Sequence, residues 1–185
     1  PGKPLKKILD IPMIAHCYER ALLSGACDKL IIATPDQEIN EWSQSQGIPS
    51  VITSHSHQRA TERAKEVLDI LAEQGCNYDL ILLLQGDEPQ IFPDDINNLK
   101  DSFAGKDLEA ANLIFQIADD DLEDPNVVKA VTDNKLKIKF FSRSHVPFNS
   151  IKTFRQLGMI GFTNEALKHY TSLSPTELEE LESID

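Results

Sequence analysis

A strand-like apolar segment, YDLILLLQGD, ends on the polar sequence Gln85-Gly86-Asp87-Glu88-Pro89. Asp87 directly after a buried strand would lie at the edge of an α/β sheet, where ligands bind. It could hold a hard cation such as Mg²⁺, which takes one or two carboxylates together with substrate phosphates. The amide of Gln85 is suited to reading the edge of a base. Gly-Asp-Glu-Pro is equally good turn chemistry, so the pattern alone leaves both a site and a plain polar turn open.

Three basic residues stand where they could contact an anion. Lys3, in PGKPL, could belong to a flexible phosphate-binding loop, or the segment could be a Pro-rich turn before a helix. Arg59 and Arg63 are four residues apart near the start of a predicted helix. Their side chains could add to the helix-end N–H groups in binding an anion, or they could form a solvated charged face.

Two further polar clusters carry weaker signals. His55 and His57 could bind a metal, but no third ligand is apparent, so a polar loop is the simpler interpretation. Ser142, Arg143 and His145 follow a predicted strand and could equally form a surface turn. The chain contains neither GxxxxGK[ST] nor GxGxxG, so the common P-loop and dinucleotide-binding classes lack support.

The elements that position these residues alternate between strand and helix in the first half of the chain. Strands are predicted at residues 28–34, 48–53 and 78–87, with helices between them, which is typical of a right-handed parallel α/β sheet. The last of these strands is the most apolar and is predicted to be central. Thr34 is the expected cap of the first intervening helix. Closely spaced strands fill the second half, with Asp133-Asn134 as a hairpin turn and a capping box at Ser174–Glu177 before a final helix.

Composition narrows the classes of function. The chain has 185 residues, with 18 Lys+Arg against 30 Asp+Glu, so its formal net charge is −12. This acidic balance argues against non-specific binding of nucleic acid. The 3 cysteines lack CxxC spacing, which favours free thiols in a reducing cytosol. No apolar stretch reaches the length of a membrane span. We therefore expect one cytoplasmic domain over residues 1–185.

Read in order, the segments resemble the 3-deoxy-manno-octulosonate cytidylyltransferases (CMP-Kdo synthetases) and, more distantly, the acylneuraminate cytidylyltransferases. The matching segments span nearly the whole chain in the family's order. They are PGKPL, PMIAHCYERA, IIAT, HQRATER, LQGDEP, DPNVVK, FFSRSHVPF, RQLGMIGF and PTELEELES.

The resemblance implies a Rossmann-like (GT-A-like) three-layer nucleotidyltransferase fold with a mostly parallel central sheet and a smaller mixed β region. It implies transfer of CMP from CTP to an acidic sugar, with release of pyrophosphate, for lipopolysaccharide biosynthesis. Mg²⁺ would be the cofactor and the complete protein would be a homodimer. The implied roles are triphosphate contact and catalysis for Lys3, Mg²⁺ binding and catalysis for Asp87, nucleotide binding for Arg59, Arg63 and Gln85, and sugar binding for Arg143, Gln156 and Glu182.

The chain departs from the family pattern in three places. Arg59-Ala60 stands where the family usually has Ser-Gly, and Gln156 stands where it usually has His. The family also has a strand before PGKPL and a second metal-binding Asp beyond ESID, so we expect both ends to be incomplete and Pro1 to lie within a motif. Two alternatives remain: a transferase of the same fold that uses another acidic sugar, such as an acylneuraminate-type acid, or another nucleotide, and a non-catalytic truncated homologue that serves as a binding protein.

Overall fold

The computed structural model describes residues 2–117, 121–148 and 152–184. The chain divides into two compact units, of which unit 1 holds residues 1–111 and 158–173 and unit 2 holds residues 112–157 and 174–185. Strands β6 (Ala110–Gln116) and β9 (Phe154–Thr163) each pass from one unit into the other. Neither unit is therefore one continuous stretch of sequence, and the single domain expected from the sequence stays a prediction.

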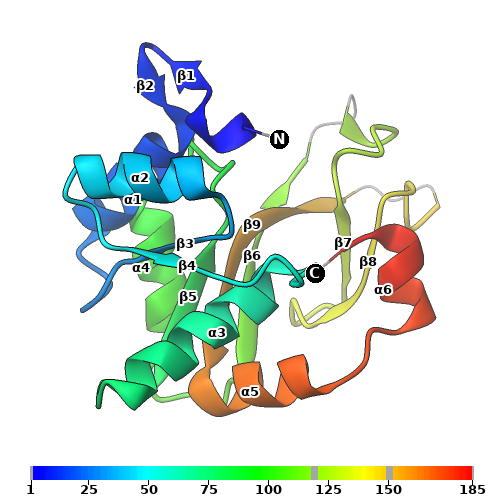
Figure 1. Cartoon of the computed structure of the whole chain (residues 1–185). Helices are drawn as coiled ribbons and strands as arrows, with labels where there is room; N and C mark the ends of the chain where they lie inside the picture. The colour runs from blue at the N-terminus through cyan, green and yellow to red at the C-terminus, as the bar shows by residue number, and fades with distance from the viewer. Residues whose placement is uncertain (1, 118–120, 149–151, 185) are drawn as a thin grey trace. The chain divides into compact units, whose positions relative to one another are not determined.

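Unit 1 opens with a short 3₁₀ helix and then builds the predicted strand–helix–strand motif (Figure 1). Strands β3 (Ile32–Thr34) and β4 (Ser50–Ile52) are parallel, with Ile32 opposite Ser50 and Thr34 opposite Ile52. Helix α2 (Gln37–Ser45) makes the crossover between them. The remaining elements of this part are η1 (Lys3–Leu5), β1 (Lys7–Ile8), β2 (Ile11–Pro12), α1 (Met13–Ser24) and α3 (Ala60–Glu73).

The predicted cap of α2 is wrong by two residues. Asp36, not Thr34, is the N-cap, and its side chain accepts a hydrogen bond from the Glu38 N–H. Thr34 is still paired in β3, where its carbonyl accepts from the Thr53 N–H. Its hydroxyl instead accepts from the Asp36 N–H at 3.1 Å, because a Thr side chain can close a local turn before the helix begins.

The apolar strand β5 (Leu80–Leu84) corrects the expectation of a mostly parallel sheet. The α/β class is as expected, but β5 pairs antiparallel with β9, with Leu80 opposite Thr163 and Leu84 opposite Met159. Several elements separate the two strands in sequence, among them α4 (Pro93–Ser102) and β6. Local hydrophobic patterning could not reveal this direction, because the partner strand comes from far along the chain.

Two apolar clusters hold unit 1 together. One joins Leu68 of α3 to Ile160 and Phe162 of β9 and to Leu167 of α5 (Asn164–Ser172). The other joins Ile14 of α1 to β3 and α2 through the residues Ile32 and Ile39. Helix α1 also packs against α4, and α3 packs against α5 (Figure 1). The helices that flank β5 and β9 are thus fixed by apolar contacts, which orient the loops at the strand ends.

Unit 2 contains the hairpin of β7 (Lys129–Thr132) and β8 (Ile138–Ser142), with the start of β9 paired to β7. The hairpin was predicted, but its loop runs over residues 133–137 and places Leu136 in the left-handed region at φ 60°. Helix α6 (Glu177–Glu182) is capped by the box of Thr176 with Glu179, not by one beginning at Ser174.

Lys129 is fully buried in unit 2 and donates to two backbone carbonyls, of Asp124 and Arg143. Burial lowers the pKa of its amine, and the two carbonyls are the acceptors that make a buried cation tolerable. None of the helices in the described part of the chain is long and apolar enough to cross a membrane.

Leu167 provides a test of the unit 1 core. Its side chain has 0% exposure and packs in the cluster with Leu68 and Phe162. We expect Leu167→Ala to lower the free energy of unfolding by about 2–5 kcal/mol, because it leaves a cavity. Urea unfolding measures the loss. Leu173→Ala, at a half-exposed position just after the same helix, is the matched control, and an equal loss there would contradict the assigned core.

Candidate active site

The end of β5 is followed by the polar sequence Gln85-Gly86-Asp87-Glu88-Pro89. The Gln85 N–H donates to the Gly158 carbonyl at 2.7 Å, which extends the pairing with β9 by one residue. The chain then turns, and the Glu88 N–H donates to the Gln85 carbonyl at 3.3 Å. Asp87 is exposed on this turn, whereas Glu88 is half-buried. The turn interpretation is therefore correct as local structure, and it presents Asp87 outward at the end of a strand.

Lys3 and Asp87 form an ion pair although 84 positions separate them in sequence. The Lys3 amine donates to the Asp87 carboxylate at 2.7 Å, and both side chains keep much of their exposure. The hydrogen bond and the charge of Asp87 raise the pKa of Lys3, so the ammonium form persists. The structure thus brings together the residue expected to contact a triphosphate and the residue expected to hold a metal.

A cavity of about 420 Å³ lies in unit 1 beside this pair. Its walls are largely apolar and come mainly from α1, β3, α3 and β5. The side chains of the lining that carry oxygen or nitrogen are Tyr18, Thr34, Arg63, Gln85 and Asp87. Cys17 also lines the cavity. The pKa of its thiol is raised to about 11, chiefly because the thiol is buried. A neutral thiol is a poor nucleophile, so the cavity offers polar and cationic contacts and no activated sulfur.

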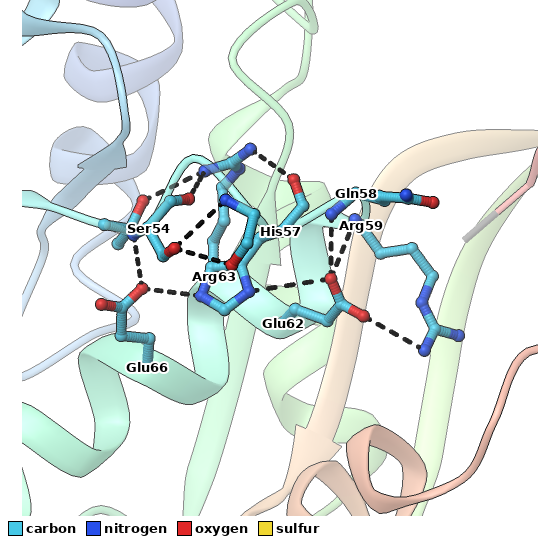
Figure 2. A network of polar contacts seen from close by, with 9 residues as sticks. Ser54, His57, Gln58, Arg59, Glu62, Arg63 and Glu66 are labelled. Carbon is cyan, nitrogen blue, oxygen red and sulfur yellow. Dashed lines mark hydrogen bonds and ion pairs between the residues drawn. The ribbon is translucent and has the colours of Figure 1, made fainter.

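Arg63 is held by acceptors of the loop that precedes α3 (Figure 2). One terminal nitrogen donates to the Thr53 hydroxyl at 3.2 Å and to the Ser54 carbonyl at 3.1 Å, and the other donates to the His57 carbonyl at 2.9 Å. Three neutral acceptors fix the guanidinium without cancelling its charge. Arg63 therefore stands in a set position on the wall of the cavity.

Carboxylates one helical turn apart on α3 fix that loop in turn (Figure 2). Glu66 accepts from the Ser54 N–H at 2.8 Å and from the His57 ring at 2.7 Å. Glu62 accepts from the Gln58 N–H at 3.0 Å. The bond from Ser54, with help from His57, holds the pKa of Glu66 below its ordinary value of 4.5. His57 thus lies in a polar loop, as predicted, and its ring contact with Glu66 helps to hold that loop.

Arg59 points to a different neighbour from Arg63. Its guanidinium carbon lies 5.2 Å from the centre of the Tyr170 ring, and it donates to the Tyr170 hydroxyl at 3.3 Å. It also pairs with Glu62 at 3.4 Å. These contacts connect the start of α3 to α5. A nucleotide contact by Arg59 stays a prediction, while the structure gives this side chain a packing and cation–π role.

Two of the predicted sugar-binding residues, Arg143 and Glu182, bind each other in unit 2. Glu182 accepts from the Arg143 N–H and from the Ser142 hydroxyl, both at 2.8 Å, and these bonds lower the pKa of its carboxyl. The Arg143 side chain donates to the carbonyls of Glu182 and Ser183. Gln156 lies on β9, where its N–H donates to the Val128 carbonyl at 2.8 Å. All three sugar contacts stay predictions.

The carboxylates fit a metal only in part. Asp87 offers one exposed carboxylate, whereas the neighbouring Glu88 accepts from the Gly158 N–H at 2.8 Å. Within residues 2–117, 121–148 and 152–184 no group of three or more His, Cys, Asp or Glu residues could hold an ion. One carboxylate is enough for Mg²⁺ that is bound together with a nucleoside triphosphate, since Mg²⁺ keeps water and phosphate oxygens as its other ligands.

Sequence reasoning missed the part played by Glu88 and Gly158. It considered Glu88 only as a neighbour of Asp87, whereas the structure bonds its carboxylate to the backbone of β9. A signal for Gly158 was present, because a glycine inside a strand pattern often marks a close approach by another group. The contacts of Thr53 and Ser54 with Arg63 left no such signal.

Glu66→Gln tests the loop clamp by its pH dependence. The pKa of Glu66 is lowered in the folded state, so its carboxylate stabilises the fold above the unfolded pKa and loses that effect as pH falls through the folded pKa. We expect the variant to be less stable than the parent at pH 7, with the difference shrinking towards pH 3, as measured by urea unfolding. Asp69→Asn, which breaks only the partly exposed pair with Lys65 on the same helix, should cost less. A pH-independent difference for Glu66→Gln would contradict the clamp.

Comparison with known proteins agrees with this geometry. The family model described as cytidylyltransferase matches residues 1–185. The 3-deoxy-manno-octulosonate cytidylyltransferase of Thermodesulfovibrio yellowstonii is 34% identical over 199 residues, covering 100% of this chain and 78% of the relative. The protein of the same name from Leptospira biflexa is 37% identical over 191 residues, covering 100% of this chain and 76% of the relative.

Solved structures give the same result. A CMP:2-keto-3-deoxy-manno-octonic acid synthetase complexed with CTP superposes with a TM-score of 0.87 at 30% identity, covering 99% of this chain and 76% of that one. A Bacillus anthracis structure named for a glucose-1-phosphate thymidylyltransferase gives a TM-score of 0.67 at 16% identity, which shows a similarity of fold and nothing more. Since the family model spans residues 1–185 and relatives at 34% and 37% identity cover the whole chain, the chain belongs to the cytidylyltransferase family.

Proposed function

We propose that this protein transfers CMP from CTP to 3-deoxy-manno-octulosonate and releases pyrophosphate. The observation that carries the proposal is the Lys3–Asp87 pair at 2.7 Å, at the end of β5 and beside a cavity that Gln85 and Arg63 also line. A cation suits a phosphate, a carboxylate suits Mg²⁺ and an amide suits the edge of a base, so this set is suited to a nucleoside triphosphate with its metal. The names of the relatives and the CTP in the similar structure agree with this choice of substrate.

The ion pair is suited to an exchange of partners when the nucleotide binds. Lys3 is exposed and protonated, so its ammonium group can move from Asp87 to a phosphate without first leaving a buried position. Asp87 would then be the residue available to hold Mg²⁺, and the ion, when bound, would neutralise charge on the phosphates. The residues themselves hold the triphosphate in line for attack by the sugar hydroxyl, which is the main demand of phosphoryl-type transfer.

Arg63 and Gln85 would supply further contacts to the bound nucleotide. The guanidinium of Arg63, fixed by neutral acceptors of its loop, supplies a second positive group on the cavity wall. The amide of Gln85 has both a donor and an acceptor for the edge of cytosine. Binding of the sugar by Arg143, Gln156 and Glu182, and the homodimer, rest on family resemblance.

Calorimetry with CTP, UTP, ATP and GTP, each with and without Mg²⁺, tests the nucleotide proposal. We expect CTP to bind most tightly and its affinity to fall when Mg²⁺ is omitted. Equal affinity for all four nucleotides would remove the base-reading role of Gln85. Release of pyrophosphate that depends on 3-deoxy-manno-octulosonate separates an enzyme from a binding protein, and its replacement by an acylneuraminate identifies the alternative sugar class.

Asp87→Asn should reduce turnover by about a hundredfold or more, because it removes the carboxylate that holds the metal. The fold should lose no more than about 1 kcal/mol, since the ion pair with Lys3 is exposed. Steady-state pyrophosphate release and urea unfolding measure the two effects. Asp101→Asn, on the exposed surface of α4, is the matched control and should leave both unchanged. Near-normal activity of Asp87→Asn at saturating Mg²⁺ would make Asp87 a turn residue only.

A further inference from the structure

Gly158 is buried on β9 directly against the side chain of Gln85. A Cβ atom added at Gly158 would lie 2.7 Å from Gln85 Oε1 and 3.0 Å from both Cβ and Cδ of Gln85. The contact with Oε1 is shorter than real Cβ atoms make and the other two are very tight, so any residue larger than glycine would displace the amide. The backbone at Gly158 is not in the left-handed region. The position therefore needs glycine for space and not for its conformational freedom.

Both backbone polar groups of Gly158 are bound by the strand end that carries Gln85. Its carbonyl accepts from the Gln85 N–H at 2.7 Å, and its N–H donates to Glu88 Oε1 at 2.8 Å. Glu88 is tied back to the same turn, since its own N–H donates to the Gln85 carbonyl at 3.3 Å. The residues Gln85, Glu88 and Gly158 thus form a closed set of contacts with little freedom to shift.

We propose that Gly158 is a positioning residue that sets the Gln85 amide and thereby selects cytosine over uracil, with Glu88 holding Gly158 in place. This inference rests on the proposed function, in which Gln85 reads the base. Cytosine presents an amino group where uracil presents a carbonyl oxygen, so the two bases differ by a donor and an acceptor at one edge. An amide carries both kinds of group, and only a fixed location and orientation lets it favour one base.

Displacing the amide should therefore cost selectivity more than stability. The Gln85 amide is at the far end of a flexible side chain, so it can swing away from a new methyl group. We expect Gly158→Ala to lower the ratio of UTP to CTP dissociation constants by about tenfold, which corresponds to the loss of one good polar pairing with a base. Calorimetry of the full chain with each nucleotide and Mg²⁺ measures the ratio.

Gly161→Ala is the matched control on the same strand. Its added Cβ would meet Phe103 at 2.6 Å and 2.9 Å and Leu82 at 3.3 Å, so it crowds the apolar core and does not touch Gln85. This variant should lose thermal stability while keeping the parent's ratio of dissociation constants. A ratio that falls equally in Gly161→Ala would show that crowding of β9 in general, and not the Gln85 contact, controls selectivity, which would overturn the inference.

A double-mutant cycle tests the contact without any nucleotide. The drop in Tm caused by Gly158→Ala should shrink when Gln85 is also replaced by Ala, because the contacts with Gln85 Oε1 and Cδ are then gone and only the 3.0 Å contact with Cβ remains. The drop caused by Gly161→Ala should be the same in both backgrounds. Additive effects of Gly158→Ala and Gln85→Ala would overturn the packing argument whatever the protein binds.

The outcomes separate this inference from the proposed function. A parent protein with equal affinity for CTP and UTP removes the proposed base reading, whereas a parent that prefers CTP and a folded Gly158→Ala that prefers it equally overturn the role of Gly158. Should Gly158→Ala fail to fold, Glu88→Ala takes its place, because it releases the Gly158 N–H. Glu88→Ala should lower the ratio of dissociation constants. Glu88→Gln should keep the parent's ratio, because its side-chain carbonyl oxygen can still accept from the Gly158 N–H. An unchanged ratio in Glu88→Ala would overturn the inference.

Discussion

The antiparallel register between β5 and β9 is the constraint on which the candidate site depends. Leu84 lies opposite Met159, so the next pair along the ladder is Gln85 with Gly158. A slip by one residue would turn every side chain of β5 to the other face and separate the amide from its glycine. Apolar packing of Ile160 and Phe162 against α3 and α5 resists that slip. The pairing of β5 with β9 therefore determines both the apolar packing of unit 1 and the position of Gln85 against Gly158.

The cavity of unit 1 shows how positive groups can be placed together in an acidic protein. The formal net charge is −12, yet Lys3 and Arg63 supply positive groups beside the same cavity. Lys3 is held by a carboxylate that can release it, whereas Arg63 is held by carbonyl and hydroxyl oxygens that leave its charge in place. The carboxylates of Glu62 and Glu66 are engaged with the loop itself. Local arrangement, and not the total charge, decides what these residues can bind.

Local signals in the sequence predicted a good part of this structure, and non-local contacts account for what they missed. The parallel pair of β3 and β4 and the polar turn at Asp87 follow from apolar periodicity and turn chemistry, which act over a few residues. The direction of β9 beside β5 and the support of Gly158 by Glu88 do not, because their partners lie about 70 or more positions apart. The two misplaced helix caps failed for a local reason, because polar residues close together compete for the same role. Asp36 caps α2 while Thr34 stays in β3, and Thr176 rather than Ser174 caps α6.

The thiol of Cys17 lines the cavity but is poorly reactive towards oxidants and alkylating reagents. Oxidants and alkylating reagents attack the thiolate, and burial holds the pKa of this thiol at about 11, so almost none of it is ionised at neutral pH. Cys27 and Cys76, by contrast, are both exposed. A maleimide dye or spin label would therefore attach to these two thiols in preference to the cavity wall. The native chain thus offers reporting positions that leave the cavity lining chemically intact.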